Sequence, residues 1–147
     1  MSADPTFIVR QVRWADAAEQ LRTVRLAVFV REQGVPEDME WDGLDSTCIH
    51  ALATDRQGNA IGTARLLPDG HIGRMAVLLP WRRAGVGKSM LTMLLDIACA
   101  RGDFEAVLHA QTHAVAFYRR AGFRVSSGEF MEAGIPHVEM RRALRCG

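Results

Sequence analysis

The chain has 147 residues, 48% of them hydrophobic, and its 18 basic and 17 acidic residues leave a formal net charge of +1. This length and apolar content suit one compact domain with a real core, and we expect a single domain over residues 5–145. The near-neutral charge excludes the basic excess of a typical nucleic-acid-binding domain, and no apolar run is long enough to span a membrane.

The cysteines and the start of the chain bear on the cellular compartment. Cys48, Cys99 and Cys146 are widely spaced and odd in number, which argues against a disulfide framework and favours a reducing compartment. We interpret Cys99 as a residue of the core. Because the first residues also lack the charged and apolar regions of a secretory signal, we expect a soluble cytoplasmic protein.

The first part of the chain predicts a strand and then a helix. Residues 7–14 alternate in polarity as a half-buried strand does. Asp16 and Glu19 have the interval of a capping pair that opens a helix, and Gly34-Val35-Pro36 ends it. Its apolar face is formed by residues at helical spacing, Leu21, Val24 and Val28.

The middle of the chain predicts an antiparallel meander. The acidic stretch 37–45 precedes it as a loop or short helix, which we expect to be mobile. Strands are expected over residues 48–54, 60–67 and 71–78, joined by turns rich in Asp, Gly, Pro and Asn.

The last part predicts alternating helices and strands. A helix over residues 85–100 carries an apolar face of Val86, Met90, Met93 and Ile97. A buried strand over 104–110 is followed by a short helix over 112–120 that Gly122 closes. Residues 123–125 and 137–141 form a last strand pair, so the predicted order is β-α-β-β-β-α-β-α-β-β.

The run Arg82-Arg83-Ala84-Gly85-Val86-Gly87, between a predicted strand and a predicted helix, indicates an anion site. Its glycines let the main chain approach a ligand closely, and the first helical turn leaves N–H groups without intrahelical partners. These groups and the helix dipole suit a phosphate. The alternative is a solvated cluster of Arg82, Arg83 and Lys88, but such charge opposes the dipole unless an anion is bound.

Gly87-Lys88-Ser89 also matches the end of the nucleotide-binding pattern G-x-x-x-x-G-K-[ST], which would suggest a nucleotide phosphohydrolase. The first glycine of that pattern would stand where the chain has Arg82. Because a bulky cationic residue does not easily make the turn of a glycine, we expect no such magnesium-nucleotide site.

Read from the other end, Arg82-x-x-Gly85-x-Gly87 resembles the pyrophosphate loop of the GNAT acetyltransferases, usually Gln or Arg, two residues, Gly, one residue, and Gly or Ala. Residues 111–123 are similar to the family stretch N-x-x-A-x-x-F-Y-x-x-x-G-F, with Gln111 in place of the usual asparagine. Residues 28–33 and 134–137 resemble the ElaA-like and YjcF-like bacterial subgroup. Together these segments cover nearly the whole chain.

The resemblance implies an α+β fold with a mixed, mostly antiparallel central sheet of about six to seven strands, flanked by helices. The sheet would splay between strands 4 and 5, which end near Leu78 and His109, and the splay would hold acetyl-coenzyme A (acetyl-CoA). The implied activity is direct transfer of the acetyl group, in a ternary complex, to a primary amine of a small molecule or to an exposed amino group. Dimers are common in this family, and the sequence leaves the oligomeric state open.

The resemblance also implies how acetyl-CoA is bound. Backbone amides of residues 83–89 would hold the pyrophosphate, and main-chain groups of residues 75–77 would pair with the pantetheine like an added strand. The expected cofactor-binding residues are Met75, Ala76, Val77, Arg82, Arg83, Gly85, Val86, Gly87, Lys88, Ser89, Gln111, Phe117 and Tyr118.

Acetyl transfer needs an acid to protonate the departing thiolate. A phenol is suitable, because its unperturbed pKa of ~10 exceeds that of an ordinary thiol. Tyr118, the only tyrosine, is the expected acid. Without the family pattern, a helical tyrosine would be interpreted as a packing residue.

The reaction also needs a base, because an ammonium group has no lone pair for the attack. Glu32, His109 and His137, together with Glu139 on the same strand face, are the candidates, and a chain of water molecules is a further alternative. Each has an ordinary structural role as its competing explanation. His109 and His113 have the interval of a helical zinc pair, but only one of them lies in a predicted helix, so we expect no metal.

The acceptor is not identified by the sequence. An acidic group could attract a cationic amine, although such runs are usually solvated: Glu37, Asp38, Glu40, Asp42 and Asp45. The alternative to an enzyme is a non-catalytic CoA-binding sensor or interaction module on the same scaffold, and the intact Tyr118 argues against it.

Overall fold

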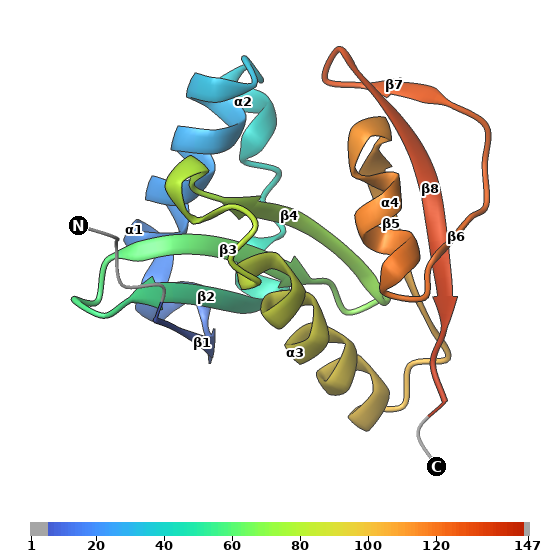
Figure 1. The fold of residues 1–147 in the computed structure, drawn as a ribbon, viewed down its shortest axis with the longest axis horizontal. Helices are drawn as coiled ribbons and strands as arrows, with labels where there is room; N and C mark the ends of the chain where they lie inside the picture. Colours follow the sequence, from blue (N-terminus) through green and yellow to red (C-terminus); the bar gives the residue numbers. More distant parts are fainter. Residues whose placement is uncertain (1–5, 146–147) are drawn as a thin grey trace.

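The computed structural model describes residues 6–145, which form one central sheet with helices on both faces (Figure 1). Its eight strands follow the order β1-β2-β3-β4-β5-β8-β6, and β7 pairs with β8 outside this path. The sheet is antiparallel except between β4 and β5. Pro5, where the expected domain begins, and Cys146 lie outside the described residues.

The predicted order of elements is confirmed, with two short additions. The first half of the chain contains β1 (Phe7–Val12), α1 (Trp14–Arg25), α2 (Glu37–Glu40), β2 (Ile49–Asp55), β3 (Ala60–Leu66) and β4 (His71–Val77). The second half contains α3 (Val86–Ala100), β5 (Glu105–Gln111), α4 (Val115–Arg120), β6 (Arg124–Val125), β7 (Phe130–Glu132) and β8 (Ile135–Ala143). The additions are α2 and β7.

The first helix starts earlier than predicted and ends as predicted. α1 begins at Trp14 and continues as a π-helical segment, Leu26–Glu32. The predicted capping pair is wrong, because Asp16 lies inside the first turn and its carboxylate accepts a hydrogen bond from Arg13 Nε at 2.9 Å. Gly34 has a left-handed φ of 73°, which suits glycine and ends the helical region.

Strand alternation places two helices on opposite faces of the sheet. In β2, Ala51 and Ala53 belong to the core cluster that includes Met90 of α3, whereas Leu52 packs in a cluster with Leu21 of α1. α1 and α3 therefore cover opposite faces of the meander.

The predicted apolar face of α3 is confirmed in part. Val86 and Met90 are buried, but Met93 and Ile97 are only half-buried. The fully buried side of the helix also includes Leu91, Leu94, Leu95 and Ala98. In the following strand the prediction is wrong at its first residue, since Phe104 lies outside β5 and is 90% exposed.

The sheet splays between β4 and β5, as expected. These parallel strands pair only where His71 meets Val107 and Ile72 meets Leu108. Beyond that point β4 runs on to Val77 paired with β3 alone, and β5 pairs with β8 alone (Figure 1). The facing edges of β4 and β5 therefore keep unpaired main-chain groups.

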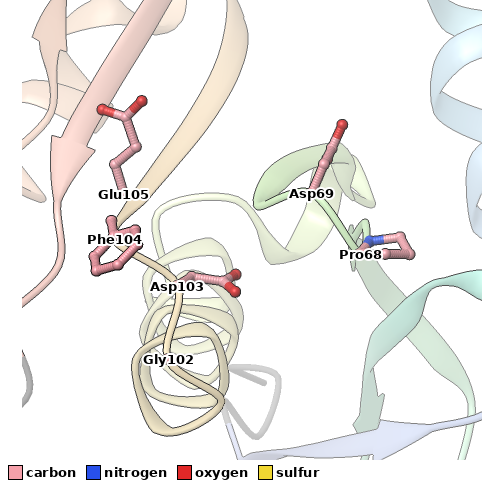
Figure 2. A pocket seen from close by; sticks show the side chains of 6 residues that line it. All are labelled: Pro68, Asp69, Gly102, Asp103, Phe104 and Glu105. Atoms are coloured by element: carbon pink, nitrogen blue, oxygen red, sulfur yellow. The ribbon is translucent and has the colours of Figure 1, made fainter.

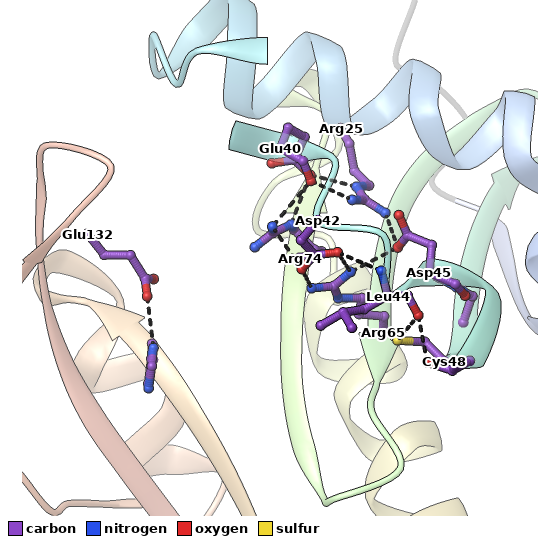
Figure 3. Close-up of polar contacts among 12 residues, drawn as sticks. Arg25, Glu40, Asp42, Leu44, Asp45, Cys48, Arg65, Arg74 and Glu132 are labelled. Carbon is purple, nitrogen blue, oxygen red and sulfur yellow. Dashed lines mark hydrogen bonds and ion pairs between the residues drawn. The ribbon is translucent and has the colours of Figure 1, made fainter. Parts of the chain in front are cut away.

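The acidic stretch 37–45 is solvated only in part, because Glu37 and Asp38 are exposed but other carboxylates are paired. Glu40 and Asp45 are 3% and 6% exposed, and with Asp42 they form a cluster of ion pairs against arginines from α1, β3 and β4 (Figure 3). The pairs are Arg25 with Glu40 and Asp45, Arg65 with Asp42 and Asp45, and Arg74 with Glu40 and Asp42. This cluster, which we call the acid–arginine cluster, neutralises carboxylates that were considered as an attractor for a cationic amine.

The cysteines only partly follow expectation. Cys48 is a free, buried thiol, whereas Cys99 is half-buried and disulfide-bonded, so the argument from cysteines for a reducing compartment is not supported. Within residues 6–145, no helix is both long enough and apolar enough to cross a membrane.

Candidate active site

A cavity of about 1390 Å³ opens where β4 and β5 diverge, and we call it the cleft. It extends from the loop before α3 to the β7–β8 hairpin. Of the predicted site residues, Ser89 and Glu139 do not line it. Those that do are Glu32, Met75, Ala76, Val77, Arg82, Arg83, Gly85, Val86, Gly87, Lys88, His109, Gln111, Phe117, Tyr118 and His137.

A smaller, open hollow of about 490 Å³ lies between residues 68–69, before β4, and residues 102–105, which lead into β5 (Figure 2). Its carboxylates already have partners, Asp69 with His71, Asp103 with Arg101, and Glu105 with Arg141. The cleft is therefore the candidate site.

Left-handed backbone shapes the loop that precedes α3. Arg83 has a φ of 68° and Gly85 a φ of 89°. Gly85 is the N-cap of α3, and no side chain caps this helix. Because neither a capping side chain nor an acidic residue occupies the first turn, its N–H groups and the positive end of the dipole are available to an anion.

Gly87 lies where the start of α3 meets α4. A Cβ at this position would lie 3.4 Å from two ring carbons of Phe117 and 3.9 Å from Met75 Sδ, which are ordinary van der Waals contacts. The loop of residues 82–87, which we call the anion loop, is therefore a neighbour of the Phe117-Tyr118 pair.

Arg82 is committed to a structural contact. Its guanidinium donates two hydrogen bonds to the Glu32 carboxylate, at 2.7 and 2.6 Å, and its Nε donates to the Val77 carbonyl at 2.9 Å. The hydrogen bond from Arg82 holds the pKa of Glu32 below its ordinary value. Both oxygens of Glu32 are thus occupied, which makes this carboxylate a weak proton acceptor in the observed arrangement.

Tyr118 is enclosed by aromatic rings and keeps a nearly free hydroxyl. Its ring centroid lies 5.0 Å from that of Phe117 and 6.0 Å from that of Phe123. Its hydroxyl donates only to the thioether of Met75, at 3.7 Å, and a thioether is a weak acceptor. Burial raises the pKa of Tyr118 to about 12, so the phenol stays protonated at neutral pH.

Gln111 links the two walls of the cleft. It ends β5, and its Nε2 donates to Gln33 Oε1 at 2.9 Å, while Gln33 Nε2 returns a longer bond of 3.5 Å. Gln33 follows the π-helical segment on the opposite wall. The predicted cofactor residue Gln111 is thus joined to the helix that carries Glu32.

Three histidines gather at the end of the cleft formed by the β7–β8 hairpin, His71 on β4, His109 on β5 and His137 on β8. Glu132 bridges two of them. Its Oε1 lies 3.0 Å from His109 Nδ1, and its Oε2 lies 3.6 Å from His137 Nε2.

Glu132 was not predicted from the sequence, because β7 was not. The strand pair β7–β8 is joined by a two-residue turn at Ala133-Gly134, whose φ values are 51° and 75°. In the sequence, the only sign of this hairpin turn is the glycine at position 134. Without the favoured Asn-Gly or Asp-Gly pair, that signal is weak.

Glu139 lies outside the cleft, whereas His113 lines it. The Glu139 carboxylate accepts hydrogen bonds from Arg141 Nε at 3.0 Å and Ser126 Oγ at 2.9 Å, and it does not line the cleft. The Arg141 bond holds the pKa of Glu139 below its ordinary value. His113 follows β5 in a short 3-10 turn. In the part of the chain that the structure describes, no group of three His, Cys, Asp or Glu residues could hold a metal ion.

Comparisons with known proteins agree with this geometry. Residues 17–144 match the family described as "Acetyltransferase (GNAT) domain". The uncharacterised N-acetyltransferase YjcF of Bacillus subtilis is 40% identical over 131 residues, which cover 84% of this chain and 93% of that protein.

Solved structures are similar over almost the whole chain. The crystal structure of an acyl-CoA N-acyltransferase from Pseudomonas aeruginosa is 32% identical with a TM-score of 0.84, covering 94% of this chain and 100% of that one. The crystal structure of Escherichia coli ElaA is 27% identical with a TM-score of 0.83, covering 93% and 99%.

Proposed function

Because the chain belongs to the GNAT acetyltransferases and is an acyltransferase, we propose that it transfers the acetyl group of acetyl-CoA to a primary amine. The acceptor is a small molecule or an exposed amino group. The transfer is direct, within one complex of protein, donor and acceptor.

The unpaired edge of β4 beyond Ile72 is the observation that carries this proposal. An extended pantetheine chain carries amide groups, and main-chain groups of residues 75–77 on this edge can pair with them as with an added strand, apart from the Val77 carbonyl, which accepts from Arg82. At the end of that edge, the uncapped N-terminus of α3 offers N–H groups to the pyrophosphate, with charge from Arg83 and Lys88. Both features line one cleft.

The chemistry requires that one bond form and one break. The neutral amine attacks the thioester carbonyl, the C–N bond forms, the C–S bond breaks, and the thiolate leaves. Tyr118 donates its hydroxyl proton to that thiolate. Since the pKa of Tyr118 is about 12, well above the ~8.5 of an ordinary thiol, its hydroxyl first stabilises the developing charge by a hydrogen bond. The sulfur is protonated late, and the proton that the attacking nitrogen loses as the amide forms restores the phenol.

The amine must lose its ammonium proton before the attack. Among the candidates, His109 lines the cleft, is partly exposed, and has its ring held by Glu132. We therefore assign the proton acceptor to His109. His137 is nine-tenths buried beside it, and Glu32 acts by holding Arg82 and the loop before α3.

Thermal unfolding with acetyl-CoA tests donor binding, because a ligand that binds only the folded state raises its stability. We expect acetyl-CoA to raise the Tm, by a margin that grows with ligand concentration, and ATP with magnesium to leave it unchanged. A shift with ATP and magnesium alone would contradict the proposal. The transfer itself is tested by thiol release with primary amines.

A further inference from the structure

We propose that Glu132 is a positioning residue for the acceptor amine: it fixes His109 in the tautomer that can take the proton, and with His137 it forms a seat for the ammonium group. This inference rests on the proposed acetyl transfer. It concerns the end of the cleft formed by β5, β7 and β8.

The contact with Glu132 determines the tautomer of His109. A carboxylate only accepts hydrogen bonds, so the ring nitrogen that faces it at 3.0 Å, Nδ1, must carry the proton. In the neutral ring, Nε2 then holds the lone pair. Nε2 has no hydrogen-bond partner among residues 6–145, and the His109 side chain is 38% exposed where it lines the cleft.

The second histidine is fixed by a backbone carbonyl. His137 Nδ1 lies 2.7 Å from the Ile135 oxygen, which only accepts, so Nδ1 is the donor. The lone pair of the neutral ring is then on Nε2, which faces Glu132 Oε2 at 3.6 Å. When the His137 ring is neutral, two acceptors face each other with no proton between them, and a donor of several N–H bonds satisfies both. A primary ammonium group is such a donor.

Aromatic packing keeps these groups in place. The Phe130 ring lies 5.1 Å from His109, edge to face, and 6.0 Å from His137, stacked. Phe130 and Glu132 both belong to β7, and they lie opposite His137 and Ile135 of β8 in the hairpin register. The short strand that was not predicted thus supplies both the charge and the packing.

The proton step is balanced in atoms and charge. The ammonium bound between Glu132 and His137 gives one proton to His109 Nε2, which leaves a neutral amine and an imidazolium. The Glu132 carboxylate, 3.0 Å from the other ring nitrogen, compensates the new charge. The exposed edge of His109 can then release the proton to solvent.

Other titratable groups around His109 have partners of their own. His71, with a ring centroid 6.2 Å away, is paired with Asp69. Glu139 stands opposite His109 in the β5–β8 register and is bound to Arg141. Glu132 is the carboxylate that contacts the His109 ring directly.

The first experiment needs no acceptor. Histidine side-chain 1H–15N NMR of the free protein, with the His109 signals assigned by their loss in H109N, identifies the tautomer of the neutral His109 ring in the wild type, E132Q and E129Q. Glu129 is exposed, precedes the same hairpin and does not line the cleft, so E129Q removes a matched charge. We expect the neutral His109 ring to carry its proton on Nδ1 in the wild type and in E129Q, and this tautomer to be less populated in E132Q. A wild-type ring protonated on Nε2, or an unchanged tautomer population in E132Q, would overturn the proposal.

The second experiment uses whichever amine the wild type acetylates in a set of simple primary amines. In E132Q we expect kcat to fall about 10²-fold, KM for the amine to rise, and acetyl-CoA affinity to be unchanged. Kinetics equal to those of E129Q would overturn the role of Glu132. If the wild type acetylates no amine, the proposed function fails, while the NMR experiment still decides the placement of His109.

Discussion

Tyr118 combines a fixed ring with an almost free hydroxyl, so its chemical and packing roles can be separated. Tyr118→Phe keeps the contacts to Phe117 and Phe123 and removes only the proton donor. We expect kcat to fall about 10²-fold while acetyl-CoA affinity and Tm change little. Steady-state kinetics with a thermal-shift titration measure both quantities. An unchanged kcat would remove Tyr118 from the role of acid.

Gly85 is needed for backbone conformation rather than for space. Its φ is +89°, and an added Cβ would meet no atom within 4 Å. Gly85→Val strains the loop by about 1–2 kcal/mol and, when the backbone relaxes, moves the N–H groups at the start of α3. We expect acetyl-CoA affinity to fall more than about tenfold.

Gly58 provides a matched control for that change. It lies in the β2–β3 turn with a φ of +87° and equally open surroundings. Gly58→Val should therefore lower the Tm about as much as Gly85→Val without weakening acetyl-CoA binding, as followed by isothermal titration. Equal affinities of the two variants would contradict a pyrophosphate site at Gly85.

Single residues differ in how far the sequence predicts them. Gly85, Gly87 and Tyr118 follow from local patterns, since their neighbours in sequence are also their neighbours in the loop and in α4. The Arg82–Glu32 ion pair joins residues 50 positions apart, and Glu132 contacts His109 from 23 positions away. No local sequence pattern predicts contacts between residues so far apart in the chain.

At the scale of elements, the acid–arginine cluster fixes the segment 37–45 against the sheet. Arg25 is 1% exposed and binds both Glu40 and Asp45, at 2.7 Å each. Arg25→Met removes a positive charge that compensates the buried carboxylates of Glu40 and Asp45. We therefore expect the free energy of unfolding to fall by about 3–5 kcal/mol. Urea unfolding measures it.

Arg31→Met is the control for that substitution. Arg31 is an exposed residue of the π-helical segment, and its replacement should change stability by less than about 0.5 kcal/mol. If both variants lost a similar free energy of unfolding, the acid–arginine cluster would make no specific contribution to stability.

The same cluster predicts how stability depends on pH. The hydrogen bond from Arg65 holds the pKa of Asp42 well below its usual range. Burial acts to raise the pKa of Asp45, but Arg25 and Arg65 together bring it below the ordinary value. Because both folded pKa values are depressed, their stabilisation is present above the unfolded pKa of about 3.9 and is lost as pH falls below it.

Denaturant unfolding between pH 7 and pH 3 tests this dependence. The wild type should lose stability steeply below about pH 4, and Arg65→Met, whose carboxylates lie closer to their ordinary pKa, should be less stable at neutral pH and show a shallower loss. If the free energy of unfolding fell in parallel with pH in the two proteins, Arg65 would not be the cause of the lowered carboxylate pKa values.

Elements were predictable where their pattern is long and self-contained. The alternation in β1 and the apolar face of α1 are of this kind. The segment 37–45 was interpreted as mobile because its own composition is acidic, and its cations lie on α1, β3 and β4. β7 has three residues and pairs only with β8, so it carries no periodic pattern of its own.

At the scale of the whole molecule, the splay of the sheet determines where the proposed acetyl donor, acetyl-CoA, can bind. Only two residue pairs join β4 to β5, although each strand has seven residues. Strand patterns predict that both strands exist but not that they diverge, so the expectation of a splay came from the family resemblance. The cleft then brings the anion loop, Tyr118 and the histidines into one cavity.

The most direct test of acetyl transfer is to incubate the protein with acetyl-CoA and a set of primary amines, and to measure thiol release together with the mass of the product. We predict release that depends on the amine, with one acetyl group added to it, and a much lower rate for Tyr118→Phe. Binding of acetyl-CoA without acetylation of any amine, including exposed amino groups of peptides, would contradict the proposed activity and favour a non-catalytic CoA-binding module.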